Sequence, residues 1–374
     1  MRSYSNLPEE IIIHILSRLP AKTVGLCRCV SKPWRAVLSQ PNFIKTHLDR
    51  SRNLRVESLV LIADARGYIC SAPLSDAHHL FDEITITATK VSFADHPDSW
   101  IQVYASCDGL LMVGDDQGKN FVLNPVTGEI REVPQSPFAL DPHESFTMYG
   151  FGYDSANEDY KIVSISYYDT DNECGYTGNE DEPFCTEMFV NLYSLETGTW
   201  KRAESSPYDH VVGHVTSGAS VDGYIHWLAC RKPDYKSVIV AFDLVEEKFS
   251  EVPPPSSLVG KKFVFNHLVV LGGCLCIVEE TRPDVWMMKE YGVQESWTYI
   301  TVDNPGGAEI RPLCMLGQEE IVLLKDEEKL VMYNLKEKIV KDIEVHGLPD
   351  SLVPEASFVE SLVSPHGTFE AARE

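Results

Sequence analysis

A chain of 374 residues with 44% hydrophobic and 24% charged residues is long enough to bury a large core, which excludes a disordered chain. Its formal charge of −24 is unevenly divided, because residues 1–55 hold ten Lys/Arg against three Asp/Glu (10 − 3 = +7), which leaves −31 for residues 56–374. An acidic body without a long basic run argues against nucleic-acid binding and against docking on anionic lipid.

The first fifty residues predict three or four short helices. The first helix spans the segment between Pro8 and Pro20, since proline is tolerated in a first helical turn and stops a helix from within. A second helix is expected over 22–30, and a third follows Ser31, which is a suitable N-cap. A last helix begins at Pro41 and extends through residue 48.

These helices carry more large apolar residues than one internal face needs. A unit of about fifty residues also lies below the size at which a single core is comfortably stable. Two explanations remain open from the periodicity: the helices cap the domain that follows, or part of their apolar surface binds a partner. The local charge of +7 fits either an acidic partner or an ordinary solvated surface.

From about residue 54 onward, the sequence has all-β patterning, with short alternating or apolar runs punctuated by Gly, Asn-Pro and Pro clusters. A unit recurs in which a Gly-containing turn and an apolar strand are followed by a second strand that ends in a polar turn. Three clear copies and two weaker ones are 107–125, 221–244, 271–289, 189–200 and 330–340.

The polar turn positions recur at intervals of about 45–50 residues, which is the spacing of propeller blades. They are Asn124, Ser194, Asp243, Lys289 and Asn334, and the first interval is longer because of an insertion. We expect a sixth blade in which residues 357–363 pair with strands near Leu59 and Tyr68, since closing the ring with both ends of the domain removes exposed edges. A twisted sandwich fits the strand density but not the repeat.

The insertion is acidic and has some features of a calcium loop. Asp169, Asp171, Glu173 and Glu180 fall at positions 1, 3, 5 and 12 of an EF-hand-like loop, but position 6 is Cys174 and helical flanks are missing. We therefore interpret it as a mobile acidic loop that could contribute to target choice.

Motifs for catalysis are absent from the sequence. It contains no G-x-S-x-G, no G-x-x-x-x-G-K-[ST] and no H-E-x-x-H. His78 and His79 are adjacent and are expected in a solvated loop, and Gly150-Phe151-Gly152 is interpreted as a strand with packing glycines. The ten cysteines include no C-x-x-C, so we expect reduced, mostly packed thiols and neither a metal site nor a cofactor.

We also expect a protein of the cytoplasm, the nucleus or both. Glu9 and Glu10 precede any apolar stretch long enough for a signal peptide. The most apolar run, 263–278, falls short of the roughly 20 residues that span a bilayer, which predicts no membrane insertion.

The N-terminal motif closely resembles the F-box. It reads Leu7-Pro8-x-Glu10-Ile11, Ile15-Leu16-x-Arg18-Leu19-Pro20-x-Lys22, Val30-Ser31-Lys32-x-Trp34 and Pro41-x-Phe43. The resemblance implies docking onto a Skp1-like protein and, through it, onto the cullin and RING subunits of an SCF ubiquitin ligase. By position, the residues that form or support the implied Skp1-facing surface are Leu7, Pro8, Ile11, Ile12, Ile15, Leu16, Leu19, Pro20, Val30 and Trp34, whereas Ile13 and Val24 could equally be internal packing.

The β-region resembles the F-box-associated interaction domain of plant F-box proteins, the family often labelled F-box/kelch-repeat, which includes the S-locus F-box and constitutive-defence-regulator proteins. The resemblance rests on Tyr149-Gly150-Phe151-Gly152-Tyr153-Asp154 with 159–163, and on 284–293 with Ser296-Trp297. The kelch label is loose, because a Gly-Gly doublet is clear only at Gly272-Gly273.

Together these features predict an α+β multidomain protein: an F-box over 1–50, a β-propeller-like recognition domain of about six blades over 54–364, closed by strands from both ends, and a loose tail over 365–374. The resemblance implies a non-catalytic SCF adaptor that brings an unidentified protein substrate to ubiquitination and degradation. In the alternative hypothesis, the β-domain binds a small molecule or glycan, or the protein acts outside the ubiquitin ligase.

Overall fold

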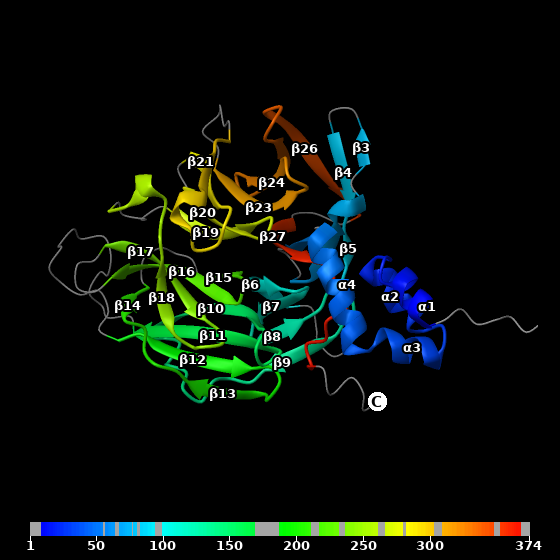
Figure 1. Cartoon of the computed structure of the whole chain (residues 1–374), viewed down its shortest axis with the longest axis horizontal. Helices are drawn as coiled ribbons and strands as arrows, with labels where there is room; N and C mark the ends of the chain where they lie inside the picture. The colour runs from blue at the N-terminus through cyan, green and yellow to red at the C-terminus, as the bar shows by residue number, and fades with distance from the viewer. Residues whose placement is uncertain are drawn as a thin grey trace, which may run out of the picture.

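The chain forms a small helical unit on one side of a β-propeller (Figure 1). The computed structural model describes residues 9–54, 57–63, 67–76, 78–80, 83–93, 99–168, 187–210, 217–231, 236–260, 266–279, 282–302, 309–347 and 352–367. In this part of the chain the fold class is the one predicted from the sequence, a helical N-terminal part followed by six β-blades.

The predicted helices are present within the described residues. They are α1 (Glu9–Leu16), α2 (Ala21–Cys27), α3 (Lys32–Leu38) and α4 (Pro41–Leu54). Ser31 is the predicted N-cap of α3, since its Oγ accepts a hydrogen bond from the Trp34 backbone N–H at 3.3 Å. Helix α2 ends at Cys27 and is followed by tight turns, whereas α4 continues past Leu48, because residues of its last turns are buried against the propeller.

The first three blades lie along the chain from residue 57 to residue 202, with one strand from the C-terminal end. Blade 1 consists of β27 (Leu352–Val359), β1 (Glu57–Ala63), β2 (Ile69–Pro73) and β5 (Thr89–Lys90). Blade 2 consists of β6 (Trp100–Cys107), β7 (Leu110–Asp115), β8 (Asn120–Leu123) and β9 (Ile130–Val133). Blade 3 consists of β10 (Ser145–Asp154), β11 (Asp159–Tyr168), β12 (Phe189–Ser194) and β13 (Thr199–Arg202).

The other three blades complete the ring. Blade 4 consists of β14 (Tyr208–Asp209), β15 (Ala219–Val221), β16 (Tyr224–Arg231), β17 (Ser237–Asp243) and β18 (Phe249–Val252). Blade 5 consists of β19 (Asn266–Leu271), β20 (Cys274–Glu279), β21 (Arg282–Met288) and β22 (Trp297–Ile300). Blade 6 consists of β23 (Ile310–Leu316), β24 (Glu320–Lys325), β25 (Lys329–Asn334), β26 (Ile339–His346), β4 (Glu83–Thr87) and β3 (His78–Leu80). Short 3-10 turns are η1 (Leu74–Asp76), η2 (Ser256–Leu258) and η3 (Gln294–Ser296).

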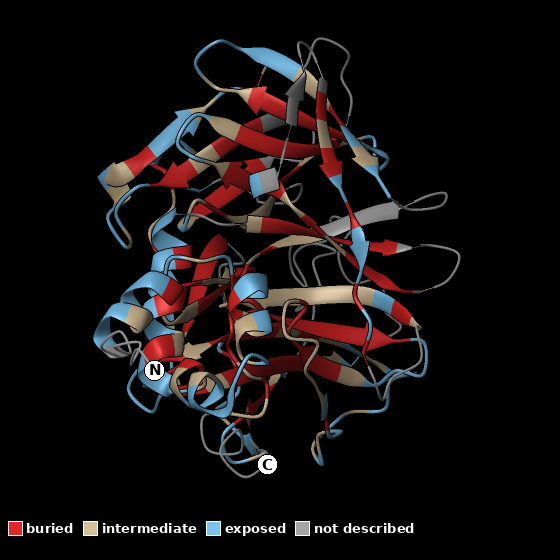
Figure 2. Ribbon diagram, turned by 90° about the vertical axis from the view of Figure 1, so that its right-hand side faces the viewer, coloured by how far each residue is buried: buried red, intermediate tan, exposed pale blue. Residues whose placement is uncertain are grey.

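The blades follow one another in a closed circle. Contacts join the innermost strands in the order β27, β6, β10, β15, β19, β23 and back to β27. Apolar clusters fill the spaces between neighbouring blades, for example between blades 3 and 4 and between blades 5 and 6. Figure 2 shows the buried residues concentrated along the strands, whereas the outer sides of the helices are exposed. The core is therefore a ring of inter-blade contacts, as a propeller requires.

The ring is closed at blade 1, as the sequence predicts. Strand β27 pairs with β1, and Leu59 lies opposite Ser357. The strand ends at Val359 rather than at residue 363, and the chain from 360 onward leaves the sheet toward the helices.

A second closure was not predicted. Strand β4 leaves blade 1 and pairs in parallel with β26 on the outside of blade 6, with Ile343 opposite Ile84. Its partner β3 contains His78 and His79, so the expectation of a loop at these histidines was wrong. The N-terminal part of the propeller thus pairs with the C-terminal part at both the inner and the outer edges of the sheets.

The two faces of the propeller differ in their connections. Apart from the parallel pair β26 and β4, neighbouring strands within a blade are antiparallel, so the turns between first and second strands and between third and fourth strands share one face. We call this the head face, because Val126 from one of these turns packs with the helices. The opposite, far face carries the other connections, including the described segment 134–144.

The head-face turns explain the sequence repeat. Backbone N–H groups within the turns donate to the side-chain oxygens of Asn124, Asp243 and Asn334. The residue four positions after each of these has a positive φ, as at Glu247 (57°). The first hairpins of blades 2, 4 and 5 have positive φ at both turn residues, as in Asp222-Gly223 and Gly272-Gly273, which is the type I′ geometry favoured by hairpins. The repeat therefore marks turns that reverse the strands at the head face.

Gly150 and Gly152 on β10 allow blade 3 to pack closely on blade 4. A Cβ at Gly150 would lie 2.5 Å from Ile225 Cγ2 and 2.7 Å from the Trp227 ring, and one at Gly152 would lie 2.7 Å from Leu244 Cδ1. Phe151 between them points to the other side and is fully buried with Ile162. The prediction of a strand with packing glycines is confirmed.

Replacing Gly150 by alanine is expected to lower the free energy of unfolding by about 1–3 kcal/mol, because the added methyl overpacks the contact with Ile225 and Trp227. Chemical denaturation of the full chain measures this change. Gly25→Ala in α2 is the matched control: a Cβ there meets no atom within 4 Å, and alanine favours the helix. Equal stability changes in the two variants would contradict the packing role.

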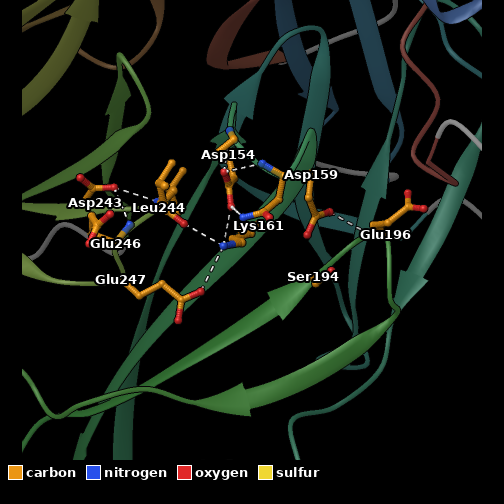
Figure 3. A network of polar contacts seen from close by, with 12 residues as sticks. Asp154, Asp159, Lys161, Ser194, Glu196, Asp243, Leu244, Glu246 and Glu247 are labelled. Atoms are coloured by element: carbon orange, nitrogen blue, oxygen red, sulfur yellow. Dashed lines mark hydrogen bonds and ion pairs between the residues drawn. The ribbon is translucent and has the colours of Figure 1, made fainter.

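A buried ion-pair network also joins blades 3 and 4 (Figure 3). The Lys161 ammonium on β11 donates to Asp154 Oδ2 and to the Leu244 carbonyl, each at 2.7 Å, and lies 3.1 Å from Glu247 Oε1. Burial lowers the pKa of Lys161, but the hydrogen bonds to Asp154 and Glu247 outweigh it and raise this pKa. The network holds a charged lysine where three polar groups replace its water shell.

Candidate functional site

The helical head, which we define as α1 to α4, has a small core that a distant part of the chain completes. Leu16, Val24, Leu38 and Phe43 are buried together, and Leu362 from the segment after β27 lies in the same cluster. Ile12, Ile13, Leu19 and Trp34 pack around it and are partly buried. This core has no room for the remaining apolar side chains of the head.

Four other large apolar side chains of the head are exposed. Ile11 and Ile15 on α1 are 45% and 48% exposed, and Leu26 in α2 and Val30 in the turns that follow α2 are 68% and 67% exposed. Ile11 and Ile15 are four residues apart, the spacing that places side chains on one side of a helix. We call these four residues the head surface.

The predicted Skp1-facing set therefore divides by burial. Ile11, Ile15, Pro20 and Val30 are exposed, Ile12, Leu19 and Trp34 are partly buried, and Leu16 is buried. Leu7 and Pro8 lie outside the described residues. Among the described members, the structure thus leaves four exposed and buries the others fully or partly.

The sequence prediction omitted Leu26, which is the most exposed large apolar residue of the head. A usable signal was its position in the short segment between Pro20 and Val30, both of which belong to the predicted set. Val24, which was left open between the two roles, is fully buried, and Ile13 is partly buried.

The exposed surface of the head is basic. Arg18, Lys22, Lys32, Arg35 and Lys45 are exposed within the described part of the head. The acidic residues of the head are Glu9, Glu10 and Asp49, so the head carries a net positive charge.

The head is fixed to the propeller at a polar junction. The Arg52 guanidinium on α4 pairs with the Asp108 carboxylate in the first turn of blade 2. The same carboxylate accepts a hydrogen bond from Tyr160 Oη at 2.9 Å, and the Asp108 carbonyl accepts one from Ser361 Oγ at 2.5 Å. Asp108 therefore links the head, blades 2 and 3 and the C-terminal segment.

Apolar contacts reinforce this junction. Leu48 and Ile44 of α4 pack with residues of blades 2 and 3 and with Val363. Asn124 Nδ2 donates to the carbonyls of Ser361 (3.2 Å) and Val363 (2.8 Å), which holds the C-terminal segment under blade 2. The head surface is consequently held in one orientation relative to the propeller.

The most buried histidine of the propeller has a structural role. His226 on β16 is fully buried, and burial lowers its pKa to about 4. Because a carbonyl only accepts, Nδ1 donates to the Ala219 carbonyl (2.9 Å) and Nε2 accepts from Tyr291 Oη (2.7 Å). A neutral, fully bonded imidazole serves packing between blades 4 and 5.

Within the described residues, no group of His, Cys, Asp and Glu side chains is arranged to hold a metal ion. Of the cysteines that the structure describes, Cys70, Cys276 and Cys314 are buried. The calcium-loop candidates Asp169, Asp171, Glu173 and Glu180 lie outside the described residues. In the described helices, none is long and apolar enough to cross a membrane.

The fold and the site define a two-part protein, a helical head with an uncovered apolar surface joined to a six-bladed β-propeller. Residues 4–46 match the F-box domain family, and residues 59–364 match the family of the F-box associated beta propeller domain. The chain therefore belongs to the F-box proteins that carry an F-box associated β-propeller, and both resemblances are confirmed.

Relatives with the same architecture occur in Arabidopsis thaliana. The chain is 31% identical to F-box protein CPR1 over 96% of this chain and 89% of that protein. It is 30% identical to F-box protein At3g07870 over 92% of this chain and 89% of that protein. It is also 27% identical to F-box/kelch-repeat protein At3g23880 over 89% of each chain.

Proposed function

We propose that this F-box protein is the substrate-recognition subunit of an SCF ubiquitin ligase. The observation that carries the proposal is the head surface, an uncovered apolar area on a segment that belongs to the F-box family. Burying several large apolar side chains contributes about 1.5–3 kcal/mol each before association costs. A Skp1-like partner supplies the surface that covers them, and through it the protein joins the cullin and RING subunits.

In this proposal the exposed members Ile11, Ile15, Pro20 and Val30 make the contact, together with Leu26. Ile12, Leu16, Leu19 and Trp34 support it from beneath. Leu7 and Pro8 belong to the same contact by their position in the motif. An acidic area on the partner suits the basic side chains of the head.

The protein itself needs no catalytic residue in this role, because ubiquitin is delivered by proximity while the propeller holds the target. Such a subunit works in the cytoplasm, the nucleus or both. We assign docking to residues 1–50 and recognition to 54–364. The tail from 365 begins at Pro365, whose carbonyl accepts a hydrogen bond from Arg131 Nη1 at 3.2 Å.

The test is capture of a purified Skp1-like protein by the full chain. Ile15→Asp is expected to reduce capture at least tenfold, because it places a carboxylate in the apolar contact. Ile339→Asp is the matched control, since Ile339 is 47% exposed on the propeller and Ile15 is 48% exposed on the head. Equal capture by the two variants and the unmodified chain would contradict the proposed interface.

The adaptor role is tested by identifying the proteins that bind the propeller in the cell. Proximity labelling with the Ile15→Asp variant, which keeps its propeller, should mark proteins that accumulate when the unmodified protein is absent from the cell. If no labelled protein accumulates, the alternative of a ligand-binding propeller outside the ubiquitin ligase gains support.

A further inference from the structure

The far face of the propeller carries an exposed apolar surface over blades 2 and 3. Ile101 on β6, Phe146 on β10 and Tyr168 on β11 are 60%, 54% and 46% exposed. Each lies at the far-face end of its strand, since β6 begins at Trp100, β10 begins at Ser145 and β11 ends at Tyr168.

These side chains lie at the far-face ends of neighbouring strands. The Tyr104 and Tyr149 rings, 4.9 Å apart, place β6 beside β10, and Ile101 and Phe146 each lie three residues earlier, toward the far face. Because side chains alternate along a strand, Phe146 and Tyr167 point to the blade 4 side of the blade 3 sheet, whereas Tyr168 and Phe189 point to the blade 2 side. Phe146 lies opposite Tyr167 in the sheet, with ring centroids 5.8 Å apart.

A cation already occupies part of this surface. The Arg202 guanidinium lies over the Phe138 ring at 5.4 Å and over the Phe189 ring at 5.3 Å. Phe189 in turn contacts Tyr168, with centroids 6.0 Å apart. The aromatic groups of blade 3 thus accept a guanidinium on their faces, which is the geometry of a cation–π contact. We define the far patch as the apolar and aromatic residues at the far edge of blades 2 and 3, on both sides of the blade 3 sheet: Ile101, Phe138, Phe146, Tyr167, Tyr168 and Phe189.

Carboxylates lie next to the far patch. Asp116 is exposed, and its backbone N–H donates to the Ser99 carbonyl beside Ile101. Glu144 precedes Phe146 by two residues, and Glu187 precedes Phe189 by two residues. Asp141 and Glu204 are also exposed in the adjoining connections.

The cations near the patch do not balance these acids. Lys119 pairs with Glu132 at 3.2 Å, and Arg202 is stacked on the rings. The described connections 134–144 and 203–207 contain Asp141, Glu144 and Glu204 but no Lys or Arg. An apolar aromatic surface with a negative rim is complementary to a cationic segment and repels an acidic one.

We propose that the far patch binds an arginine- or lysine-rich segment of the protein target that crosses the far edge of blade 3, so that its cationic side chains lie on the exposed rings of Phe146 and Tyr168 and pair with the carboxylates of the rim. This inference rests on the proposed function, because it assigns the class of target that the adaptor recognises. The head surface lies on the opposite face, so the target and the Skp1-like partner occupy separate surfaces.

The experiment measures fluorescence anisotropy of labelled peptides with the full chain. The probes are short peptides of alternating arginine and glycine, glutamate and glycine, and leucine and serine. The arginine peptide is expected to bind, with affinity that falls as salt concentration rises. The double variant Phe146→Ser/Tyr168→Ser should weaken this binding at least tenfold, and the rim variant Asp141→Lys/Glu144→Lys should weaken it and reduce its salt dependence.

Val340→Ser is the control, because Val340 is a comparably exposed apolar residue on blade 6. Equal arginine-peptide affinity in the far-patch variants and this control would overturn the proposal, and so would preferential binding of the glutamate or leucine peptide. Capture of the Skp1-like protein is measured in parallel. Far-patch variants should keep it, so loss of peptide binding with intact capture separates this inference from the proposed function.

Discussion

The variant Lys161→Ala is expected to lower the free energy of unfolding by about 3–5 kcal/mol, because it leaves buried carboxylate charge without its partner. Asp154 is fully buried, and Lys161 supplies the ammonium 2.7 Å away. Chemical denaturation at neutral pH measures the loss.

Lys201→Ala is the matched control for this prediction. Lys201 contacts the same Glu247 carboxylate at 2.6 Å, but its side chain is 57% exposed, whereas that of Lys161 is 8% exposed. Water screens the exposed pair, so we expect a cost of about 1 kcal/mol or less. A cost for Lys201→Ala as large as that for Lys161→Ala would show that burial does not decide the strength of the network.

The same network gives a pH dependence. Burial alone raises the pKa of Asp154, but the hydrogen bonds from Asn157 and Lys161 outweigh it and lower this pKa below its ordinary value. A lowered folded pKa adds stability that is complete above the unfolded pKa and is lost as pH falls through the folded pKa. The stability difference between the unmodified chain and Lys161→Ala should therefore shrink on acidification.

The variant Leu362→Asp should destabilise the helical head while blades 4 and 6 remain folded. Leu362 is 1% exposed in the core of the head, and leucine-to-alanine changes at such sites already cost about 2–5 kcal/mol. A carboxylate there costs more, because its burial is uncompensated. Hydrogen exchange is expected to accelerate in α1 to α3 and to stay slow in β16 and β24.

Leu54→Ala is the comparison for this variant, since Leu54 is an exposed leucine at the end of α4. Its hydrogen exchange should match that of the unmodified chain, and its stability should change by no more than about 0.5 kcal/mol. Unchanged exchange in α1 to α3 of Leu362→Asp would contradict the role of the C-terminal segment in the head.

Much of the propeller could be predicted because its signals are local. Turns such as Asp222-Gly223 require positive φ, which only a few residue types adopt readily. Side-chain oxygens such as that of Asn334 accept hydrogen bonds from the backbone N–H groups two and three residues later. The repeat interval followed from these turns. The strands themselves needed only apolar patterning.

The second closure escaped prediction because its partners are far apart in sequence. Glu83–Thr87 alternates like any other strand, and nothing in that segment specifies a parallel pairing with β26. The end of β27 was misplaced for a related reason. Phe358 packs between blades and Leu362 packs in the head, and an apolar residue gives no sign of which neighbour buries it.

The site was predictable as a motif but not as a surface. The sequence identified the head, yet which of its apolar side chains remain exposed depends on tertiary packing. Val24 is buried and Leu26 is exposed, although the two lie on one short helix. The side chain that completes the core of the head, Leu362, follows the last propeller strand in the sequence.

The contact between Leu362 and the head determines when the head can finish folding during translation. Helices α1 to α4 leave the ribosome first, but their core includes a leucine that is translated after the strands of all six blades. The head as described here is therefore assembled only after translation has passed Leu362, so a nascent chain or a prematurely terminated product lacks the finished docking element. In the proposed function, assembly into the ligase would then favour chains whose propeller and head are both complete.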